Sequence, residues 1–565
     1  MDTNVLYYGD NLDILRRYIQ DESVDLVYLD PPFNSQRDYN VIFKSEAGRR
    51  SDAQLLAFED TWHWGPSAEA TYAYLTNTAR HEGRVPDTVS SLIAALRKGI
   101  GENQMMAYLV EMSVRLVELR RVLKPAGSLY LHCDPTASHY LKVIMDGIFG
   151  AVNFRNEITW KRFSAKNDPH RYGRNHDVIL FYSRGPTMTW NVEYGPFEAD
   201  YVEENYRYVE PDTGRRYRLS DLTANKPGGD VDYEWHGMRP YKGRHWAFSR
   251  ANMDKFLEAG RIVFRKTGMP VYKRYLDEQP GVPLQDIWTD IRLQAGSRER
   301  LGYPTQKPLE LLERIINASS NPGDTILDPF CGCGTAIVAA QKLQRRWIGI
   351  DITYLAIAVM RARLKDTFTI EDVPVVGQPT EVEGARQLAQ STEGRYQFQW
   401  WALALVDAQP LGGVEKKGAD RGVDGVITFT DKHGELQSVL VSVKSGHVTS
   451  SMVRDLKGVM DRDKAAIGVF LTLEEPSKEM QLEADTAGLW RSDVWKRDYP
   501  RIQIITIEQL LAGKKPQLPP FVMPTYQQAA RVAAEADQPG LFDRPARLKK
   551  VAEPKPHDYV AESEG

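Results

Sequence analysis

The sequence predicts an α/β protein with several domains, built around a parallel sheet that helices cover on both faces. Three observations favour this fold class. Apolar strand-like runs alternate with helix-like segments over residues 5–184, and the alternation resumes over 307–364. A second, smaller α/β block occupies residues 396–513. The length of 565 residues exceeds what one hydrophobic core commonly holds.

Each element of the main block follows from a local pattern. The run VDLVYL at 24–29 is apolar enough for a strand buried on both faces. Residues 105–123 carry apolar residues at helical spacing, and the segment 124–127 (KPAG) ends that helix. The other predicted strands are 5–10, 128–133, 176–184, 324–330 and 346–352, and the other predicted helices are 11–20, 137–149, 307–318, 335–343 and 353–364.

Four segments interrupt or follow these blocks. Residues 40–105 have weak periodicity and predict an insertion, whereas tyrosines, arginines and glycines crowd together in 186–285. Residues 371–395 are rich in Pro, Gly, Glu and Thr, which indicates a linker, and the Pro- and Ala-rich chain after 515 indicates a loose tail. The expected divisions are therefore 1–185, 186–285, 286–370, 371–395, 396–515 and 516–565.

Composition narrows the function classes. The formal net charge is −4, so local basic patches would have to hold any nucleic acid. Three cysteines cannot form a disulfide framework, which fits a reducing cytosol. The first residues lack a basic region followed by an apolar run, and no stretch approaches roughly 18 uninterrupted apolar residues. We expect no signal peptide, no membrane partner and a cytoplasmic location.

Two predicted strands run into an aspartate and a tight turn. The strand 24–29 leads into Asp30-Pro-Pro-Phe33, and this turn is stiff because proline fixes φ and has no N–H. The strand 324–330 leads into Asp328-Pro-Phe-Cys-Gly-Cys-Gly334 and a helix. Glycines let a ligand approach the backbone, and Asp351 at the next strand end suits ribose hydroxyls. These features predict a nucleoside-containing cofactor, whereas a CxC pair alone supplies too few ligands for zinc.

The two motifs resemble those of a known family. Residues 328–334 are similar to the S-adenosylmethionine loop of amino-group DNA methyltransferases, and 30–33 to their catalytic (D/N/S)PP(Y/F) motif. The catalytic motif precedes the cofactor motif, as in the β group of that family. The resemblance covers residues 1–370. It implies a Rossmann-like, S-adenosylmethionine-dependent methyltransferase sheet with an inserted target recognition region, and double-stranded DNA as the partner.

The resemblance also assigns residues. The implied catalytic residues are Asp30, Pro31, Pro32 and Phe33. The implied cofactor-binding residues are Asp10, Thr305, Gln306, Lys307, Asp328, Phe330, Gly332, Gly334, Thr335 and Asp351. An exocyclic amine is a poor nucleophile, so acceptors that bond its hydrogens are needed, and the base must leave the duplex to reach them. A motif that begins with aspartate is typical of adenine-N6 enzymes, with cytosine-N4 as the alternative.

The segment 186–285 lies where β-group enzymes place a target recognition region. The basic residues proposed to contact DNA are Arg215, Arg216, Arg218, Lys242, Arg244 and Arg250. Two alternatives stay open. These residues form a solvated face, or the segment from about 244 to 291 is a scaffold common to the β group and specificity resides in 190–235 or 40–105.

The C-terminal block resembles the PD-(D/E)xK nuclease fold, most closely its Mrr-like branch. Asp424, at the start of the strand VITF, and Lys444, at the end of SVLVSVK, fit a metal-binding aspartate and a catalytic lysine. The residue two before Lys444 is Ser442 rather than an acid or amide. The preceding helix carries Gln397 and Gln399 where relatives often have Glu. Asp424 would hold Mg²⁺ only if another acid, such as Glu435 or Asp455, substituted.

Three hypotheses follow for the whole chain. The first is an adenine-N6 DNA methyltransferase, acting alone or beside a restriction subunit. The second is a bifunctional enzyme that also cleaves DNA with Mg²⁺, and the third is a DNA-binding protein that retains both folds without catalysis. In the tail, Gln538-Pro-Gly-Leu-Phe542 resembles peptides that bind the bacterial sliding clamp, although a flexible tail offers such short matches readily.

Overall fold

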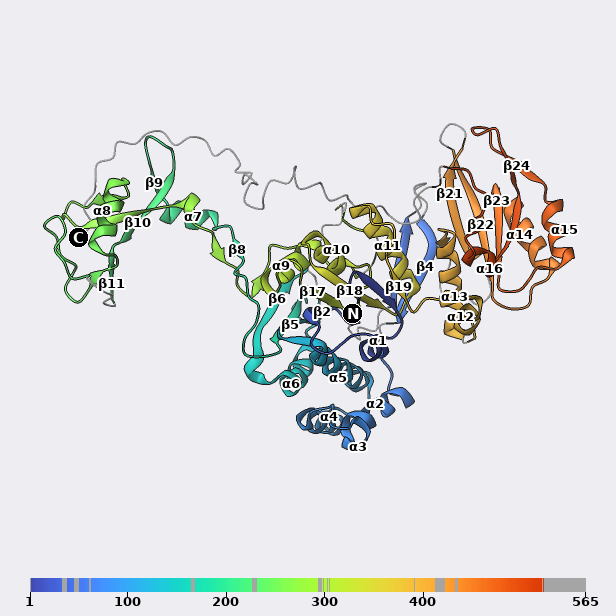
Figure 1. Ribbon diagram of the computed structural model, residues 1–565, viewed down its shortest axis with the longest axis horizontal. Helices are drawn as coiled ribbons and strands as arrows, with labels where there is room; N and C mark the ends of the chain where they lie inside the picture. Colours follow the sequence, from blue (N-terminus) through green and yellow to red (C-terminus); the bar gives the residue numbers. More distant parts are fainter. Residues whose placement is uncertain are drawn as a thin grey trace.

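The structure of the chain is a computed structural model. It describes residues 2–32, 38–44, 50–59, 62–163, 168–225, 231–292, 297, 299–301, 303, 305–390, 392–411, 422–431, 435–520 and 522. Figure 1 shows a central sheet with the insert (green) on one side and a smaller C-terminal sheet (orange) on the other. Both parts are α/β, as the sequence predicts.

The central sheet has nine strands among the described residues, in the order β16-β6-β7-β5-β2-β17-β18-β1-β19. The strands are β1 (Val5–Tyr8), β2 (Val24–Leu29), β5 (Leu123–Cys133), β6 (Phe154–Lys161), β7 (His176–Ser183), β16 (Ile287–Trp288), β17 (Thr325–Asp328), β18 (Arg346–Asp351) and β19 (Val375–Val376). The expectation of a parallel sheet is wrong for β7, which is antiparallel to β5 and β6. Antiparallel neighbours need no crossover helix between them, and the described residues between β6 and β7 contain none.

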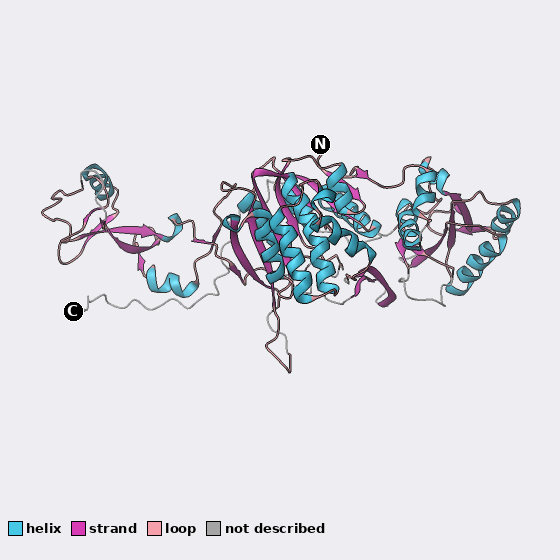
Figure 2. Cartoon of the chain, turned by 90° about the horizontal axis from the view of Figure 1, so that it is seen from below, coloured by secondary structure: helices cyan, strands magenta, loops and turns pink. Residues whose placement is uncertain are grey.

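Alternate side chains of each strand enter two different cores. Val5 and Tyr7 of β1 join one core, whereas Leu6 joins the other, so both faces of the strand are buried. The first face is covered by α1 (Asn11–Arg17), α4 (Asp87–Ile100), α5 (Gln104–Val122) and α6 (Ser138–Phe149), and the second by α9 (Leu309–Ser319), α10 (Thr335–Lys342) and α11 (Tyr354–Phe368). Figure 2 shows helices packed against the sheet.

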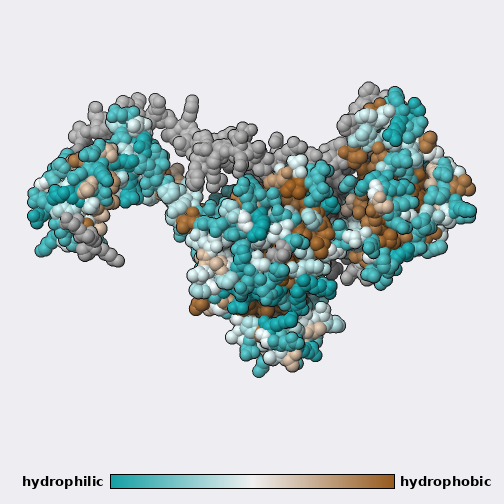
Figure 3. Space-filling view, in the orientation of Figure 1, coloured by the Kyte–Doolittle hydropathy of each residue, from teal (hydrophilic) through white to brown (hydrophobic). Residues whose placement is uncertain are grey.

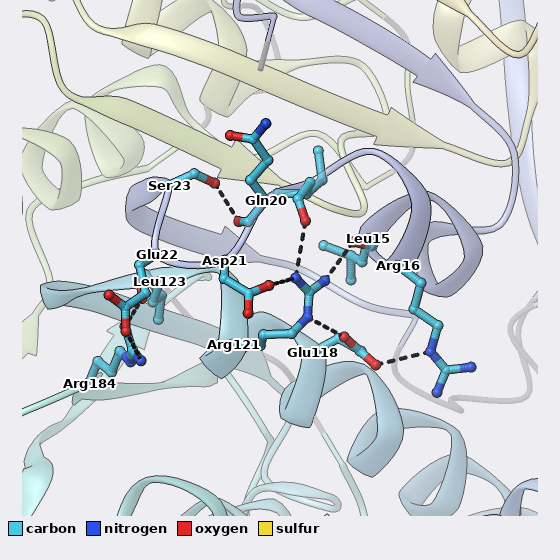
Figure 4. A network of polar contacts seen from close by, with 11 residues as sticks. Leu15, Arg16, Gln20, Asp21, Glu22, Ser23, Glu118, Arg121, Leu123 and Arg184 are labelled. Atoms are coloured by element: carbon cyan, nitrogen blue, oxygen red, sulfur yellow. Dashed lines mark hydrogen bonds and ion pairs between the residues drawn. The ribbon is translucent and has the colours of Figure 1, made fainter. Parts of the chain in front are cut away.

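Arginine side chains fix the turn that leads into β2 (Figure 4). The Arg121 guanidinium donates to the Leu15 carbonyl at 2.6 Å and to the Glu118 carboxylate at 2.7 Å, and it also pairs with Asp21. Arg184 donates to Glu22 at 2.6 Å. Contacts with α1, with α5 and with Arg184 after β7 therefore hold the start of β2. They also fix the position of its carboxyl end.

The insertion at 40–105 has more regular structure than its weak periodicity indicates. Its elements are β3 (Asp38–Lys44), β4 (Arg50–Glu59), α2 (Pro66–Thr76), α3 (Thr78–His81) and α4. Val89 and Ile93 of α4 are fully buried in the first core. The helix periodicity is weak because α2 buries little beyond Ala68 and Leu75.

The insert at 186–285 has a small core of its own, built around Leu222, Trp235, Trp246 and Met253. A four-stranded sheet in the order β13-β14-β10-β9 lies beside it among the described residues. The insert contains β8 (Tyr194–Gly195), α7 (Ala199–Asn205), β9 (Tyr208–Val209), β10 (Arg216–Asp221), β11 (Thr223–Ala224), β12 (His245–Trp246), α8 (Arg250–Glu258), β13 (Ile262–Phe264), β14 (Pro270–Tyr275) and β15 (Val282–Pro283). Its face in Figure 3 is largely hydrophilic.

The segment predicted as a linker has regular structure over part of its length. Val375 and Val376 form the edge strand β19 beside β1, and α12 (Val382–Leu388) follows. A run of Pro and Gly does not prevent a short edge strand, because such a strand needs pairing on one side only. The division of the chain into domains at 371–395 therefore stays a prediction, although this segment contains a strand and a helix.

The C-terminal block forms a five-stranded sheet among the described residues, in the order β20-β21-β22-β23-β26. Its main elements are α13 (Thr392–Leu405), β20 (Gln409–Pro410), β21 (Gly425–Thr430), β22 (Leu436–Lys444), α14 (Ser450–Asp463), β23 (Ile467–Thr472), α15 (Lys478–Thr486), β24 (Leu489–Arg491), β25 (Asp498–Pro500), β26 (Ile502–Thr506) and α16 (Ile507–Leu511). One apolar cluster joins Trp401 of α13 to Tyr354 and Leu355 of α11, so this block packs on the central part.

Candidate active site

One cavity lies at the carboxyl edge of the central sheet, where β1, β2, β17 and β18 all end. Neighbouring parallel strands end on the same edge, so loops that are distant in sequence meet there. The cavity is lined by Gly9, Asp10, Asn11, Tyr28, Asp30, Pro31, Pro32, Trp62, Arg115, Arg162, Tyr303, Thr305, Gln306, Lys307, Leu312, Asp328, Pro329, Phe330, Cys331, Gly332, Cys333, Thr335, Ala336, Asp351, Ile352 and Thr353. Both sequence motifs therefore contribute to a single site.

Asp30 follows β2 directly and faces this cavity. Its carboxylate pairs with the Lys307 ammonium, which belongs to the loop before α9. The Asp30 side chain is 16% exposed and that of Lys307 8% exposed, so the pair is largely shielded from water. Pro31 is buried beside it. Phe33, the fourth predicted catalytic residue, lies outside the described residues.

The glycine loop connects β17 to α10 through two positive φ angles. Gly332 has φ +50° and Gly334 has φ +74°, and a Cβ on Gly334 would lie 2.6 Å from Cγ of Met360. The Gly332 N–H donates to the Asp351 carboxylate at 2.9 Å. Asp351 also accepts from the Thr353 backbone N–H and hydroxyl, both at 2.8 Å. Asp351 thus fixes the loop as well as facing the cavity.

Two carboxyl groups of this loop region are shielded from water, since Asp328 is buried and Asp351 is half-buried. Burial raises the pKa of Asp328 well above its ordinary value, and the nearby Asp30 and Asp351 add to this effect. Burial likewise raises the pKa of Asp351. Buried carboxyl groups that are poorly neutralised favour a ligand that brings positive charge. This property suits a sulfonium or ammonium group.

Asp10 is held in place from both of its oxygens. One oxygen accepts from the Leu12 N–H at 2.8 Å and caps α1, and the other accepts from the Arg115 guanidinium at 2.8 Å. Arg115 is buried and also bonds Asn11, whose side chain donates to the Pro329 carbonyl at 2.8 Å. The β1 turn is therefore tied directly to the glycine loop.

The segment 305–307 contributes in different ways. Gln306 uses its amide as an internal brace, because it accepts from the Leu301 N–H at 2.9 Å and donates to the Glu299 carbonyl at 2.7 Å. Lys307 reaches Asp30 instead of the glycine loop. Thr305, Phe330 and Thr335 line the cavity, whereas Gly334 lies just behind its wall. The structure thus brings the predicted cofactor residues together, with Lys307 at the catalytic turn.

Several residues of the cavity were not expected from the sequence. Tyr28 lines it from β2 and hydrogen-bonds His132 of β5, and Arg162 lines it beyond β6. Tyr303 and Trp62 add aromatic walls. A signal was present in the sequence: polar side chains such as Tyr28 and His132 inside apolar strands need buried partners.

The six basic residues of the insert are in two different situations. Arg215 pairs with Asp277 at 2.8 Å and Glu278 at 2.7 Å. Arg218 donates to the Tyr201 hydroxyl at 3.0 Å, Arg244 to the Thr223 carbonyl at 2.7 Å and Arg250 to the Glu234 carbonyl at 2.6 Å. These four side chains make polar contacts within the insert, and Arg250 is nevertheless exposed, as are Arg216 and Lys242.

The C-terminal block places Asp424 and Lys444 together, 3.6 Å apart. Asp424 accepts from the Val443 N–H and from the Gln399 amide of α13. Gln397 points elsewhere and accepts from the Tyr354 N–H at 3.1 Å. Within the described ranges, no group of three or more His, Cys, Asp or Glu side chains could hold a metal ion, so neither Glu435 nor Asp455 completes a three-ligand site at Asp424.

Two further findings concern the described part of the chain. The Cys331 thiol donates to the Ile350 carbonyl at 3.1 Å, and Cys333 lies 3.7 Å from the Thr335 hydroxyl, so both are occupied within the loop. Across those same residues, the helices are too short or too polar to traverse a bilayer.

Two parts of the chain match known protein families. Residues 24–359 match a family described as DNA methylase, and residues 411–512 match one described as NACHT-associated inactive restriction endonuclease 1. Type II methyltransferase M.EcaI from Enterobacter cloacae is 35% identical over 263 residues, which are 46% of this chain and 57% of the relative. The StyLTI Mod subunit, a type III restriction-modification enzyme from Salmonella typhimurium LT2, is 26% identical over 60% of this chain and 50% of its own.

The chain spans about half the length of these two curated relatives. Among solved structures, TTHA0409 from Thermus thermophilus in complex with S-adenosyl-L-methionine is 15% identical. The match covers 66% of this chain and 99% of that one, with a TM-score of 0.31.

Proposed function

Residues 24–359, more than half of the chain, match the DNA methylase family, so the chain belongs to it, and we propose that it is a site-specific DNA methyltransferase. It transfers a methyl group from S-adenosylmethionine to the exocyclic amine of a base flipped out of duplex DNA. One observation carries the proposal: Asp30 and the glycine loop, about 300 residues apart in sequence, line the same cavity.

Asp30 acts on the amine of the target base. Its carboxylate would accept one amine hydrogen and the Pro31 carbonyl the other, which localises the nitrogen lone pair. Bound S-adenosylmethionine would supply the methyl group from its sulfonium, so that the new N–C bond replaces the S–C bond while the amine releases one proton. The Lys307 ammonium pairs with the Asp30 carboxylate and holds it at the cavity. Pro32 stiffens the turn, and Phe33 stacks on the flipped base.

The opposite end of the cavity holds the cofactor. Asp351 accepts the ribose hydroxyls, and Asp10 lies at the adenine end, both in orientations that their hydrogen bonds support. Asp328 and the loop residues Phe330, Gly332, Gly334 and Thr335 surround the methionine end. Thr305 lines the same wall. The raised pKa values of the two buried carboxyl groups support a positively charged ligand.

Adenine N6 is the favoured target because the catalytic motif begins with aspartate, and cytosine N4 is the alternative. Duplex DNA contacts the insert, with the exposed Arg216 and Lys242 as the first candidates for phosphate contacts. The likeness to a type III Mod subunit supports a bacterial restriction-modification context with a separate restriction subunit. A sliding-clamp contact through residues 538–542 lies outside the described residues, and a cytoplasmic location fits an enzyme that acts on DNA.

Residues 411–512 match a family described as NACHT-associated inactive restriction endonuclease 1, and we propose that the C-terminal block is related to the Mrr-like branch of the PD-(D/E)xK fold. A bifunctional methyltransferase-endonuclease is the second candidate function. Asp424 beside Lys444 favours it. The Gln399 amide on Asp424 and the apolar burial of Ser442 favour an inactive, DNA-binding block instead.

A methyl-transfer assay tests the main proposal. Wild-type protein should transfer labelled methyl groups from S-adenosylmethionine to genomic duplex DNA. Asp30→Ala removes the acceptor oxygens, and should lower the rate by about a hundred-fold or more while cofactor binding changes little. Asp13→Ala, at an exposed carboxylate on α1, is the matched control. Transfer that survives in Asp30→Ala would contradict the role of Asp30.

A further inference from the structure

Four polar side chains form a continuous chain beneath the catalytic turn. The Tyr28 hydroxyl lies 2.9 Å from Nδ1 of His132, and Nε2 of His132 lies 2.9 Å from Oδ2 of Asp177. Oδ1 of Asp177 accepts from the Arg162 guanidinium at 3.2 Å. Tyr28, His132 and Asp177 are each at most 3% exposed. The chain starts on the strand that carries Asp30 and ends at the far strand β6.

The protonation states fix the direction of each hydrogen bond. Burial alone would raise the pKa of Asp177, but the hydrogen bond from His132 and the charges of Arg162 and Lys307 lower it, so the carboxylate accepts. Burial, and then the charge of Lys307, lower the pKa of His132, so the ring is neutral near pH 7. Nε2 then donates to Asp177, and Nδ1 accepts from the Tyr28 hydroxyl.

Arg162 stands on the opposite side of Asp30 from the cofactor loop. In the sheet order, β6 lies on one side of β2, whereas β17, β18 and β1 lie on the other. Both Arg162 and the glycine loop nevertheless line the same cavity. A ligand group on the β6 side of Asp30, away from the cofactor end of the cavity, therefore contacts Arg162.

The cost of this arrangement argues against a purely structural role. A buried carboxylate with a histidine and an arginine loses solvation, and apolar residues of similar volume would commonly serve stability as well. Arg162 itself is not enclosed, since its side chain is 35% exposed. Among the described residues its guanidinium donates to Asp177, which leaves other N–H groups for a ligand in the cavity.

We propose that Arg162 binds an acceptor atom of the flipped nucleotide, and that Asp177, His132 and Tyr28 are positioning residues that hold its guanidinium at the cavity. This inference rests on the proposed function and deepens it. A guanidinium only donates hydrogen bonds, so it fits either a ring nitrogen beside the target amine or a phosphate oxygen next to the flipped nucleotide.

Binding of a pre-flipped substrate tests the assignment without turnover. The probe is a fluorescent duplex with a single adenine opposite an abasic site, where flipping needs little energy in any sequence. Arg162→Ala and Asp177→Asn should each weaken its affinity roughly ten-fold, the size of one charged hydrogen bond. The double variant should bind the probe with an affinity no lower than that of the single variant that binds it less tightly. S-adenosylmethionine affinity, measured by calorimetry, should stay within about two-fold of wild type.

Arg155→Ala is the matched control, because Arg155 lies at the other end of β6 and bonds Ser183 and the Gly185 carbonyl. Equal losses in Arg155→Ala, additive losses in the double variant, or a parallel loss of cofactor affinity would overturn the proposal. Methylphosphonates beside the adenine distinguish the acceptors: the Arg162→Ala effect vanishes on that probe if a phosphate is bound and persists if a ring nitrogen is bound. Wild type that binds as expected but never transfers methyl would refute the proposed function alone.

Discussion

At the scale of single residues, the site is defined by how its charges are shielded. Asp328 is 3% exposed, and its carboxyl group has an elevated pKa because of burial. Asp30 differs, since the Lys307 ammonium neutralises it. The cavity therefore holds one carboxylate that is paired with a cation and two carboxyl groups with raised pKa values, which the proposed function assigns to the base and to the cofactor.

Cofactor binding should therefore be linked to proton release. Without ligand, burial raises the pKa of Asp328 and Asp351, so the protonated forms persist to higher pH. A bound cation favours the ionised forms and lowers both pKa values, so affinity should increase as pH rises through the range where the free site titrates. Calorimetry in buffers of different ionisation enthalpy measures the protons released. Proton uptake, or affinity that falls over that range, would show that these groups do not face the cation.

At the scale of elements, the strand-end loops build the site and the glycine loop is the most constrained of them. Gly334 precedes α10 with φ +74°, and Met360 of α11 lies where a side chain would go. Gly323 also has a positive φ of +85°, but among the described residues the position that a Cβ would take is open. The two glycines separate backbone strain from crowding.

Gly334→Ala should destabilise the protein by about 1–3 kcal/mol more than Gly323→Ala, because only the first substitution adds overpacking to the backbone strain. Urea unfolding measures the difference, and S-adenosylmethionine affinity should fall only in Gly334→Ala. Equal costs for the two variants would mean that Met360 gives way freely and that the close approach does not matter.

Much of the element pattern could be predicted because apolar runs that are buried on both faces have few alternatives. The strand at 24–29 and the helix at 335–343 were placed within a residue or so of β2 and α10. The direction of β7 could not be predicted, because an apolar strand looks the same in either orientation. The edge strand β19 was hidden in a run of Pro and Gly, since an edge strand needs little apolar character.

The residues of the candidate site also differ in whether the sequence alone could identify them. Residues in local motifs, such as Asp30 and Asp328, could be found because their neighbours in sequence carry the signal. Arg162 could not, because it reaches the cavity through the pairing of β5 with β7 and of β7 with β6. The pairing of Lys307 with Asp30 also depends on the fold alone.

At the scale of the whole molecule, the C-terminal block differs from an active nuclease of this fold in the residues around Asp424. Asp424 uses its two oxygens to accept from Gln399 and the Val443 N–H, and Ser442 stands where an acid or amide would serve. We expect no Mg²⁺-dependent nicking of plasmid DNA by the wild type, and no change in Lys444→Ala. Nicking that requires Mg²⁺ and disappears in Lys444→Ala would establish the bifunctional alternative.

The central claim is that this chain methylates an exocyclic amine at a defined DNA sequence. Methylation-aware sequencing of DNA from cells that express it gives the base, its position and the motif together. We expect N6-methyladenine at one recurring sequence, present with wild type and absent with Asp30→Ala. DNA without any new methylated base would contradict the claim, and 4-methylcytosine at the recurring sequence would contradict the choice of adenine.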